Sequence, residues 1–334
     1  MQTVPRNIVL RKNSMSNESW RLVGDIGGTN ARFGLAGTHE GSPVIESVEY
    51  LVTAEFSSAQ AGVAHYLATV PEDRKPRDAV LAVAGPVVHG VADLTNAKGW
   101  HLNEAALAHA TGLSRVRLIN DFAALSLAVP MLRPVDLRPI GSDDLIDAGQ
   151  TVSLIGPGTG TGIGAWVVDG KQTAILVCEG GHIAFAPTDE VEVELLHVLT
   201  RRYGRVSLER ILCGQGLVNL HQALATIEGR TVADCTPSTI TEGALAGDAI
   251  ELATLNRFFG ILGSVAGDLA LVHGALGGVL LAGGILPRVV NLLRVSDFRT
   301  RFEEKGRMSK LVRNIATNLL VAQDVALLGA SRGM

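Results

Sequence analysis

The amino-acid sequence predicts an α/β protein built from two related domains. Its 334 residues exceed the length of one typical domain, because about 150 residues per domain suggests two. Short apolar runs suited to buried strands alternate with segments of helical periodicity, as in an α/β sheet. A glycine-rich turn between two apolar segments also occurs twice, within 22–35 and within 152–168. This duplicated hairpin suggests a duplicated domain, and we expect both turns to face one cleft.

Composition restricts the class of protein. Apolar residues make up 47% and charged residues 19% of the chain, which excludes a disordered or fibrous protein. The net charge of −4, without a dense Lys/Arg run, excludes a nucleic-acid footprint. Three cysteines without a C-x-x-C pair argue against a disulfide framework or structural zinc. We find no signal peptide, and the most apolar stretch, 278–285, is too short for a membrane span of ~20 residues. We therefore expect a soluble, cytoplasmic protein.

The first part of the chain predicts strands accompanied by helices. Residues 1–19 are polar and without periodicity, and we interpret them as a flexible leader. After the first hairpin, alternation of apolar and polar residues predicts a strand over 44–52. Helical spacing predicts a helix over 59–69, which Pro71 ends. The continuous apolar run 79–84 is typical of a buried strand.

Two polar residues follow the next predicted strand, which ends at Ile119. Asn120 and Asp121 come directly after it and precede a helical apolar run over 122–129. Ligands of α/β sheets bind at the carboxyl ends of strands. Asp121 could act there as a general base that accepts a hydroxyl proton while the oxygen attacks phosphorus. Asn120 offers a donor and an acceptor to neighbouring hydroxyls. The structural alternative is that Asp121 caps the helix, and both roles can coexist.

After the second hairpin the chain becomes mostly helical. A helix is predicted over 190–203, and Ser207 is predicted to cap the next one. A capping box at 239–242 is predicted to start a long helical region towards His273. The apolar run 278–284 predicts a buried strand that ends in a diglycine.

Domain boundaries follow from these elements. We expect residues 20–131 to form a small α/β domain with the first glycine-rich turn and Asp121. The short apolar helix within 323–334 is predicted to return to this domain, and residues 132–322 are predicted to form a larger α/β domain.

Three glycine-rich segments are candidate phosphate sites. Glycine adopts φ > 0 and lets a ligand approach the main chain, and successive N–H groups in such a turn form an anion-binding concavity. The alternative for each hairpin is an ordinary turn. The diglycine precedes a helix N-terminus, a third place where a nucleotide could meet backbone. The candidate residues are Gly24, Asp25, Ile26, Gly27, Gly28, Thr29 and Asn30, then Gly158, Thr159 and Gly160, then Gly283 and Gly284.

Asp25 is a carboxylate among these phosphate-binding groups. Its most sensible use is to hold Mg²⁺ through water, since this ion keeps much of its hydration shell. The sequence contains no G-x-x-x-x-G-K-[ST], which excludes a P-loop enzyme. The first turn also lacks the G-x-G-x-x-G spacing of a dinucleotide site.

Glu179, His182 and Glu209 could converge on one small polar ligand. The first two flank a diglycine, whose flexible backbone would let both side chains reach the same molecule. A metal site is disfavoured because further ligands at useful spacing are missing, and the alternative is a solvated loop. Glu209 does not fit a capping box, although a carboxylate in a first helical turn also suits the helix dipole. Because aromatic residues are only 4% of the chain, a sugar would be bound mainly by hydrogen bonds.

Six motifs stand in a characteristic order along residues 20–334. They are L-V-G-D-I-G-G-T-N-A-R-F, L-I-N-D-F-A-A-L-S, G-P-G-T-G-T-G-I-G, E-G-G-H-I-A-F-A-P, V-S-L-E-R-I-L-C-G-Q-G-L-V-N-L and G-G-V-L-L-A-G-G-I-L-P-R. In this order they resemble the bacterial glucokinases of the proteobacterial type, in the actin-like/hexokinase superfamily. The resemblance implies two actin-like (ribonuclease H-like) α/β domains flanking a cleft, usually in a homodimer. It also implies phosphorylation of glucose at the 6-hydroxyl with ATP and Mg²⁺.

The resemblance implies a role for each candidate residue. Asp121 matches the catalytic base, and the first turn matches the ATP phosphate loop. Gly283 and Gly284 match the nucleotide side of the large domain. One departure lies beside the phosphates, where Pro157-Gly158 and Thr161 stand in place of the more usual Ala and Leu. The residues that match sugar ligands are Asn120, Asp121, Thr159, Glu179, His182 and Glu209.

Two alternatives stay open at this point. One is a kinase for another hexose, such as mannose, fructose or an N-acetylhexosamine. The other is a non-catalytic sugar sensor that keeps the fold and the sugar site. The presence of Asp121, the intact first turn and the lack of a DNA-binding segment favour an enzyme.

Overall fold

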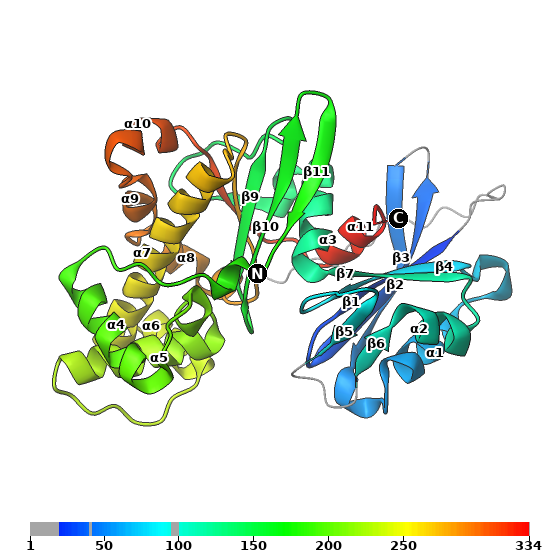
Figure 1. Ribbon diagram of the computed structural model, residues 1–334, viewed down its shortest axis with the longest axis horizontal. Coiled ribbons are helices and arrows are strands. Elements are labelled where there is room, and N and C mark those ends of the chain that lie inside the picture. Colours follow the sequence, from blue (N-terminus) through cyan, green and yellow to red (C-terminus); the bar gives the residue numbers. More distant parts are fainter. Residues whose placement is uncertain (1–19, 40–41, 95–99, 334) are drawn as a thin grey trace.

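The computed structural model describes residues 20–39, 42–94 and 100–333, which form two lobes built on two mixed sheets. We call the five-stranded sheet with the helices within residues 59–111 the first lobe, and the six-stranded sheet with the helices within residues 190–312 the second lobe. Figure 1 shows the helices α3 (Asp121–Ala128) and α11 (Val325–Ala330) between the two sheets.

The sheet of the first lobe has the strand order β3-β2-β1-β4-β7. Neighbours are antiparallel from β3 to β1 and parallel from β1 to β7. Its strands are β1 (Arg21–Ile26), β2 (Asn30–His39), β3 (Ser42–Val52), β4 (Asp78–Val83) and β7 (Arg115–Asn120). The lobe also contains α1 (Ala59–Thr69), α2 (Glu104–Thr111), β5 (Val91–Asp93) and β6 (His101–Asn103).

The sheet of the second lobe has the order β11-β10-β9-β12-β13-β8 and repeats this pairing pattern. The first three strands are antiparallel and β9, β12 and β13 are parallel, so the hairpin duplication predicted from the sequence is confirmed. The strands are β8 (Leu137–Pro139), β9 (Val152–Pro157), β10 (Thr161–Asp169), β11 (Gln172–Val177), β12 (Gly278–Leu281) and β13 (Thr317–Leu320). The helices are α4 (Glu190–Tyr203), α5 (Gly214–Ile227), α6 (Pro237–Ala246), α7 (Ala249–Val272), α8 (Val290–Arg294), α9 (Phe298–Glu303) and α10 (Ser309–Val312).

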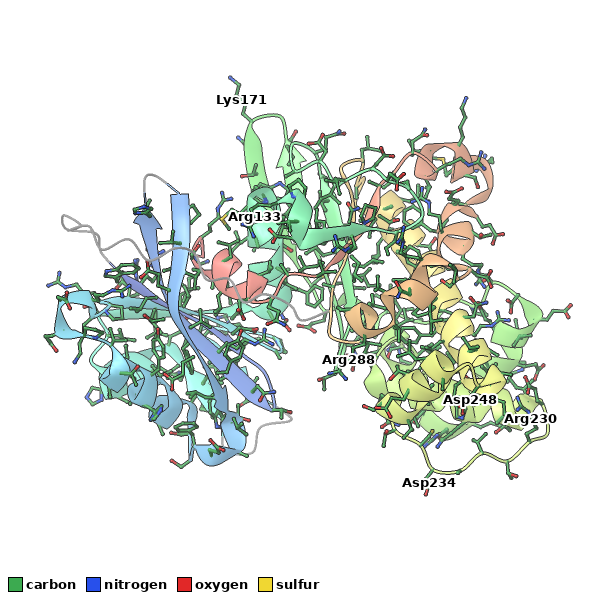
Figure 2. The ribbon with its side chains drawn as sticks, turned by 180° about the vertical axis from the view of Figure 1, so that it is seen from behind. Arg133, Lys171, Arg230, Asp234, Asp248 and Arg288 are labelled. Atoms are coloured by element: carbon green, nitrogen blue, oxygen red, sulfur yellow. The ribbon has the colours of Figure 1, made fainter. Side chains whose placement is uncertain are left out.

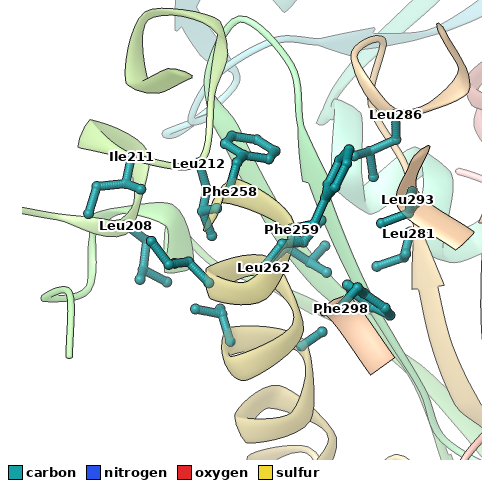
Figure 3. Packing of buried hydrophobic residues seen from close by; sticks show 14 of the residues in the cluster. Leu208, Ile211, Leu212, Phe258, Phe259, Leu262, Leu281, Leu286, Leu293 and Phe298 are labelled. Carbon is teal, nitrogen blue, oxygen red and sulfur yellow. The ribbon is translucent and has the colours of Figure 1, made fainter. Parts of the chain in front are cut away.

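Helix α7 is the centre of the second lobe's core. Phe258, Phe259 and Leu262 are at most 1% exposed and belong to the same cluster as Phe298 of α9 (Figure 3). Among the described residues this helix alone is long and apolar enough to cross a membrane, but 72% of its most apolar window is buried inside the protein. Burial in the core accounts for that composition. The apolar run 278–285 contains the buried strand β12.

Two predicted helix starts were wrong. Ser207 precedes only a 3₁₀ turn and makes no capping bond with its side chain. Ser207 stays extended because residues 206–208 pair with 183–185, and the next α-helix begins at Gly214, capped by Cys213.

The predicted capping box at 239–242 lies three residues too late. Thr236 caps α6, and its side chain and that of Thr239 bond reciprocally to each other's backbone N–H. Pro237 favours this earlier start, since its fixed φ suits the first helical position. The helical region then breaks at Gly247, which adopts a left-handed conformation before α7.

The C-terminal helix α11 returns to the first lobe, as expected, and packs on β1, β4 and α3. The contact with α3 is unusually close, because a Cβ on Gly329 would lie 1.7 Å from the carbonyl oxygen of Ala124. Helix α3 in turn packs on β10 and β11 of the second lobe. The α3–α11 pair is therefore the packed connection between the sheets.

Replacing Gly329 with alanine should destabilise the protein by about 3 kcal/mol, because backbone on the other helix cannot yield to the added Cβ. Urea unfolding of Gly329→Ala measures this. Gly284→Ala is the matched control, since a Cβ there meets no atom within 4 Å. Equal stability of the two variants would contradict the packing argument.

Candidate functional site

The first glycine-rich turn connects β1 and β2 and is anchored by Thr53. The N–H of Gly27 donates to the carbonyl of Asn30 at 2.9 Å. Thr53 donates its hydroxyl to the carbonyl of Gly28 at 2.9 Å and its N–H to the carbonyl of Thr29 at 3.0 Å. Thr29 and Asn30 are exposed. The turn is thus held from behind while its tip is open to a ligand.

Two residues of this segment have a packing role. Ile26 is fully buried, and a Cβ on Gly24 would lie 2.7 Å from Leu81 and 3.0 Å from the ring of Phe33. Both belong to the interior of the first lobe. The tip of the turn, Gly27 to Asn30, is therefore the part of this segment that a phosphate could reach.

Asp25 lies on β1 beside the turn, and its side chain is 23% exposed. Arg32 on β2 donates to its carboxylate at 3.4 Å. Burial raises the pKa of Asp25, and the Arg32 charge opposes that shift. Within the described ranges no cluster of three or more His, Cys, Asp or Glu side chains could hold a metal. A single carboxylate next to a phosphate-binding turn fits Mg²⁺ that takes its other ligands from water and phosphate.

Asn120, and not Asp121, caps α3, which corrects the structural alternative considered for Asp121. The side-chain oxygen of Asn120 accepts from the N–H of Phe122 at 2.9 Å and of Ala123 at 3.2 Å. Its amide donates to the carbonyl of Gly85 at 3.1 Å. The side chain of Asn120 thus has a structural role. Asp121, one residue later, accepts from the N–H of Phe122 at 2.9 Å.

The environment of Asp121 disfavours its charged form. Burial, followed by the negative charge of Asp25 and that of Glu179, raises the pKa of Asp121 to about 7. A carboxyl group with a pKa near neutrality is suited to proton transfer. The same interactions show that Asp25 and Glu179, from two separate segments, each lie close enough to Asp121 to influence it.

Phe122 fixes the position of Asp121 against the second hairpin. A Cβ on Gly162 would lie 1.9 Å from the Phe122 ring, and one on Gly156 would lie 2.6 Å from it. Only glycine at these two strand positions leaves room for the ring. The start of α3 is thereby held next to the second glycine-rich turn.

The second turn is tied to the segment before α5. The N–H of Gly214 donates to the carbonyl of Gly158 at 2.9 Å. Glu209 accepts from the N–H of Thr161 at 2.9 Å, and a Cβ on Gly160 would lie 2.5 Å from its carboxylate. Thr159 at the tip is exposed. The structure thus brings Glu209 to the second turn.

Glu179 and His182 reach the same turn from another direction. Glu179 precedes the 3₁₀ turn Gly180–His182 and His182 ends it, and a Cβ on Gly181 would lie 2.1 Å from the carbonyl oxygen of Thr161. Pairing of 183–185 with 206–208 sets this loop beside Glu209. Both side chains are exposed. The backbone of this loop therefore lies next to the second turn, and the convergence of the Glu179 and His182 side chains on one ligand stays a prediction.

The diglycine after β12 lies next to the second hairpin. Gly283 has φ +89°, and a Cβ there would lie 2.2 Å from the carbonyl oxygen of Pro157. Gly284 faces open space. Arg288, labelled in Figure 2, is an exposed cation in the 3₁₀ turn that follows. This segment can therefore offer a phosphorylated ligand the backbone of the diglycine and the positive charge of Arg288.

Three side chains near Asp25 escaped the sequence analysis. Arg32 connects Asp25 to Asp324, and Tyr50 bonds to Asp324. Arg32 directly faces Asp25 across the first hairpin, a signal that the strand register could have revealed. No local sequence pattern could have placed Asp324 next to Asp25 and Arg32, because almost the whole chain separates it from them.

Comparison with known proteins identifies close relatives. A family model described as Glucokinase matches residues 22–334. The chain is 48% identical over 314 residues to a glucokinase of Caulobacter sp. (strain K31), which covers 94% of each chain. It is 41% identical over 321 residues to a glucokinase of Hahella chejuensis (strain KCTC 2396), covering 96% of this chain and 98% of that one.

Solved structures share the fold. The crystal structure of a glucokinase from an Antarctic psychrotroph is 39% identical, with a TM-score of 0.84 over 94% of this chain and 98% of that one. A ROK family glucokinase from Streptomyces griseus in complex with glucose and AMPPNP is 19% identical, with a TM-score of 0.58 over 94% and 98%. These likenesses confirm the predicted α/β fold of two actin-like units.

Replacing Asp121 with asparagine should stabilise the protein at neutral and alkaline pH. The pKa of Asp121 is raised from 3.8 in the unfolded chain to about 7 in the fold. Below about pH 4 the carboxyl group is protonated in both the folded and the unfolded chain, so it does not affect stability. Between about pH 4 and pH 7 it ionises only in the unfolded chain, and the destabilisation of the fold grows with pH until it is complete above pH 7. Thermal unfolding of Asp121→Asn should show a Tm a few degrees above the parent at pH 8 and no gain at pH 4. Asp169→Asn, at the exposed end of β10, is the control, and a gain that does not depend on pH would contradict the argument.

Proposed function

Because this chain belongs to the glucokinase family and phosphorylates glucose with ATP, we propose that Asp121 is the general base of an in-line phosphoryl transfer. The observation that carries the proposal is its position. Asp121 stands at the carboxyl end of β7, within electrostatic reach of Asp25 at one turn and of Glu179 beside the other. A pKa of about 7 suits a carboxylate that must take a proton and later release it.

In the proposed reaction, the carboxylate of Asp121 accepts the proton of the glucose 6-hydroxyl. The oxygen forms a bond to the γ-phosphorus as the bond to the β-phosphate oxygen breaks, and ADP leaves. Phosphoryl transfer of this kind depends mainly on positioning and on charge stabilisation. The enzyme's contribution is therefore to align the hydroxyl and to bind the triphosphate through backbone N–H groups.

We propose that glucose is bound by side chains gathered around the second turn. This is supported by exposed Thr159 at the tip of the turn, by Glu209, which accepts from the N–H of Thr161, and by the packing of the loop with Glu179 and His182 against Thr161. Asn120 completes the proposed set, although its amide already caps α3 and bonds to Gly85. A site that bonds each hydroxyl rejects sugars lacking one, because its own polar groups are left unpaired. The family match favours glucose over another hexose and an enzyme over a sensor.

The proposed ATP contacts come from the three glycine-rich segments. The first turn would bind the phosphates through Gly27 to Asn30, with Gly24 and Ile26 supporting it from the core. The second turn, at 158–160, and Gly283-Gly284 would line the nucleotide side. Asp25 would hold Mg²⁺ through water, and the ion would neutralise charge on the transferring phosphates.

The domain division and the assembly are also proposals. We propose a small domain of residues 20–131 with 323–334, which the returning helix α11 supports, and a large domain of 132–322. We further propose a cytoplasmic homodimer by analogy with the family. Light scattering coupled to size exclusion would detect a monomer and so contradict the dimer, and cell fractionation tests the location.

Asp121→Asn should lower kcat by roughly 10²–10⁴-fold, because asparagine cannot accept the proton. Glucose binding, measured by calorimetry, should change little. In the parent enzyme kcat/KM for glucose should fall on the acidic side of about pH 7, as the base becomes protonated. Near-normal turnover of Asp121→Asn with unchanged glucose affinity would show that another group is the base.

Glu209→Gln should raise the KM for glucose by about tenfold, since a hydrogen bond to a charged group is worth more than a neutral one. Glutamine can still accept from the N–H of Thr161, so the second turn should keep its shape. Steady-state kinetics with glucose measures the change. Glu194→Gln on the exposed side of α4 is the control, and an equal KM in both variants would remove Glu209 from the sugar site.

A further inference from the structure

Arg32 divides its charge between two carboxylates. Its Nη1 atom lies 3.4 Å from Oδ2 of Asp25 and 3.9 Å from Oδ1 of Asp324. The side chains of Asp25 and Asp324 are 23% and 18% exposed, so both ion pairs are partly shielded from water. Arg32 also lies 5.6 Å above the ring of Tyr50. The guanidinium is therefore not committed to Asp25 alone.

Asp324 is held in place independently of Arg32. The hydroxyl of Tyr50 lies 2.8 Å from one carboxylate oxygen of Asp324 and 2.7 Å from the other. Burial and this bond raise the pKa of Tyr50 to about 12, so it stays a donor. The backbone of Asp324 is left-handed, with φ +62°, and its carbonyl accepts from Leu327 at the start of α11. A non-glycine residue in this conformation persists where its surroundings hold it.

The sharing of Arg32 affects the charge available at Asp25. An arginine paired fully with Asp25 would neutralise the carboxylate and oppose binding of a cation there. A second acid that takes part of the arginine's charge leaves Asp25 more negative. Asp324 contributes in this way because its carboxylate lies 3.9 Å from the same Arg32 nitrogen that pairs with Asp25 at 3.4 Å.

We propose that Asp324 is a positioning residue that keeps Asp25 available to the divalent cation accompanying ATP by drawing Arg32 towards itself. The inference rests on the proposed function of Asp25 as the Mg²⁺ anchor. It adds a role for the junction before α11, where the C-terminal helix meets the phosphate-binding turn.

Asp324→Asn tests the inference, because asparagine tolerates left-handed backbone and keeps the shape of the side chain. AMPPNP binding is measured by calorimetry at a series of Mg²⁺ concentrations. The Mg²⁺ concentration that gives half of the full effect, which we call the Mg²⁺ midpoint, should be roughly two- to fivefold higher in the variant than in the parent, as expected for the loss of a partly exposed ion pair. The Mg²⁺ midpoint of kcat should rise equally, while glucose affinity stays constant. Tyr50→Phe keeps both charges and should raise the midpoint less, and Asp169→Asn should not change it.

A double variant isolates the cause. In an Arg32→Gln background there is no cation to share, so adding Asp324→Asn should leave the Mg²⁺ midpoint unchanged. Three results would overturn the inference. The Mg²⁺ midpoint could be unaltered in Asp324→Asn, glucose affinity could fall as much as the midpoint rises, or Asp324→Asn could have its full effect in the Arg32→Gln background. Asp25→Asn distinguishes a failure of the inferred role of Asp324 from a failure of its premise, the proposed role of Asp25 as the Mg²⁺ anchor. If that variant keeps the parent's Mg²⁺ midpoint, the proposed anchor is wrong. If it raises the midpoint and Asp324→Asn does not, only the role of Asp324 is wrong.

Discussion

The close packing of α3 against α11 and against the second hairpin is the constraint on which the rest of the site depends. Gly329 brings one helix onto the carbonyl of Ala124, and Gly156 and Gly162 leave space for the ring of Phe122. Protein interiors are packed too densely to absorb an added carbon at such points. The start of α3 is therefore fixed relative to both sheets, and Asp121 is placed next to the second hairpin.

The site concentrates negative charge at a cost in stability. The negative charges of Asp25 and Glu179 act on Asp121, and burial adds to the penalty at Asp25 and Asp121. Among the described residues, Arg32 is the cation that the ion pairs place beside Asp25. A ligand-free protein gains nothing from this arrangement, whereas the proposed binding of Mg²⁺ with a triphosphate and the proposed deprotonation of a hydroxyl would both use it. Perturbed carboxylates of this kind cluster at functional sites.

Capping shows how local and functional needs are divided between neighbouring residues. Asn120 bonds to two backbone N–H groups of α3 and to Gly85, which leaves the carboxylate of Asp121 with one backbone partner. The sequence alone could not assign these roles, because Asn and Asp are equally good caps. The same ambiguity affected Ser207, whose extended backbone pairs with residues 183–185 and does not start an α-helix.

Local sequence determined the elements and the two glycine-rich hairpins, because periodicity and breakers act over a few residues. It thereby predicted the α/β fold, and its ordered motifs predicted the family. Only the tertiary structure decided which side chains meet. Gly24 proved to be a packing residue, and the approach of Asp324 to Arg32 arises from the return of α11 to the first lobe. Such contacts depend on how distant segments pack, which no pattern within a short stretch of chain records.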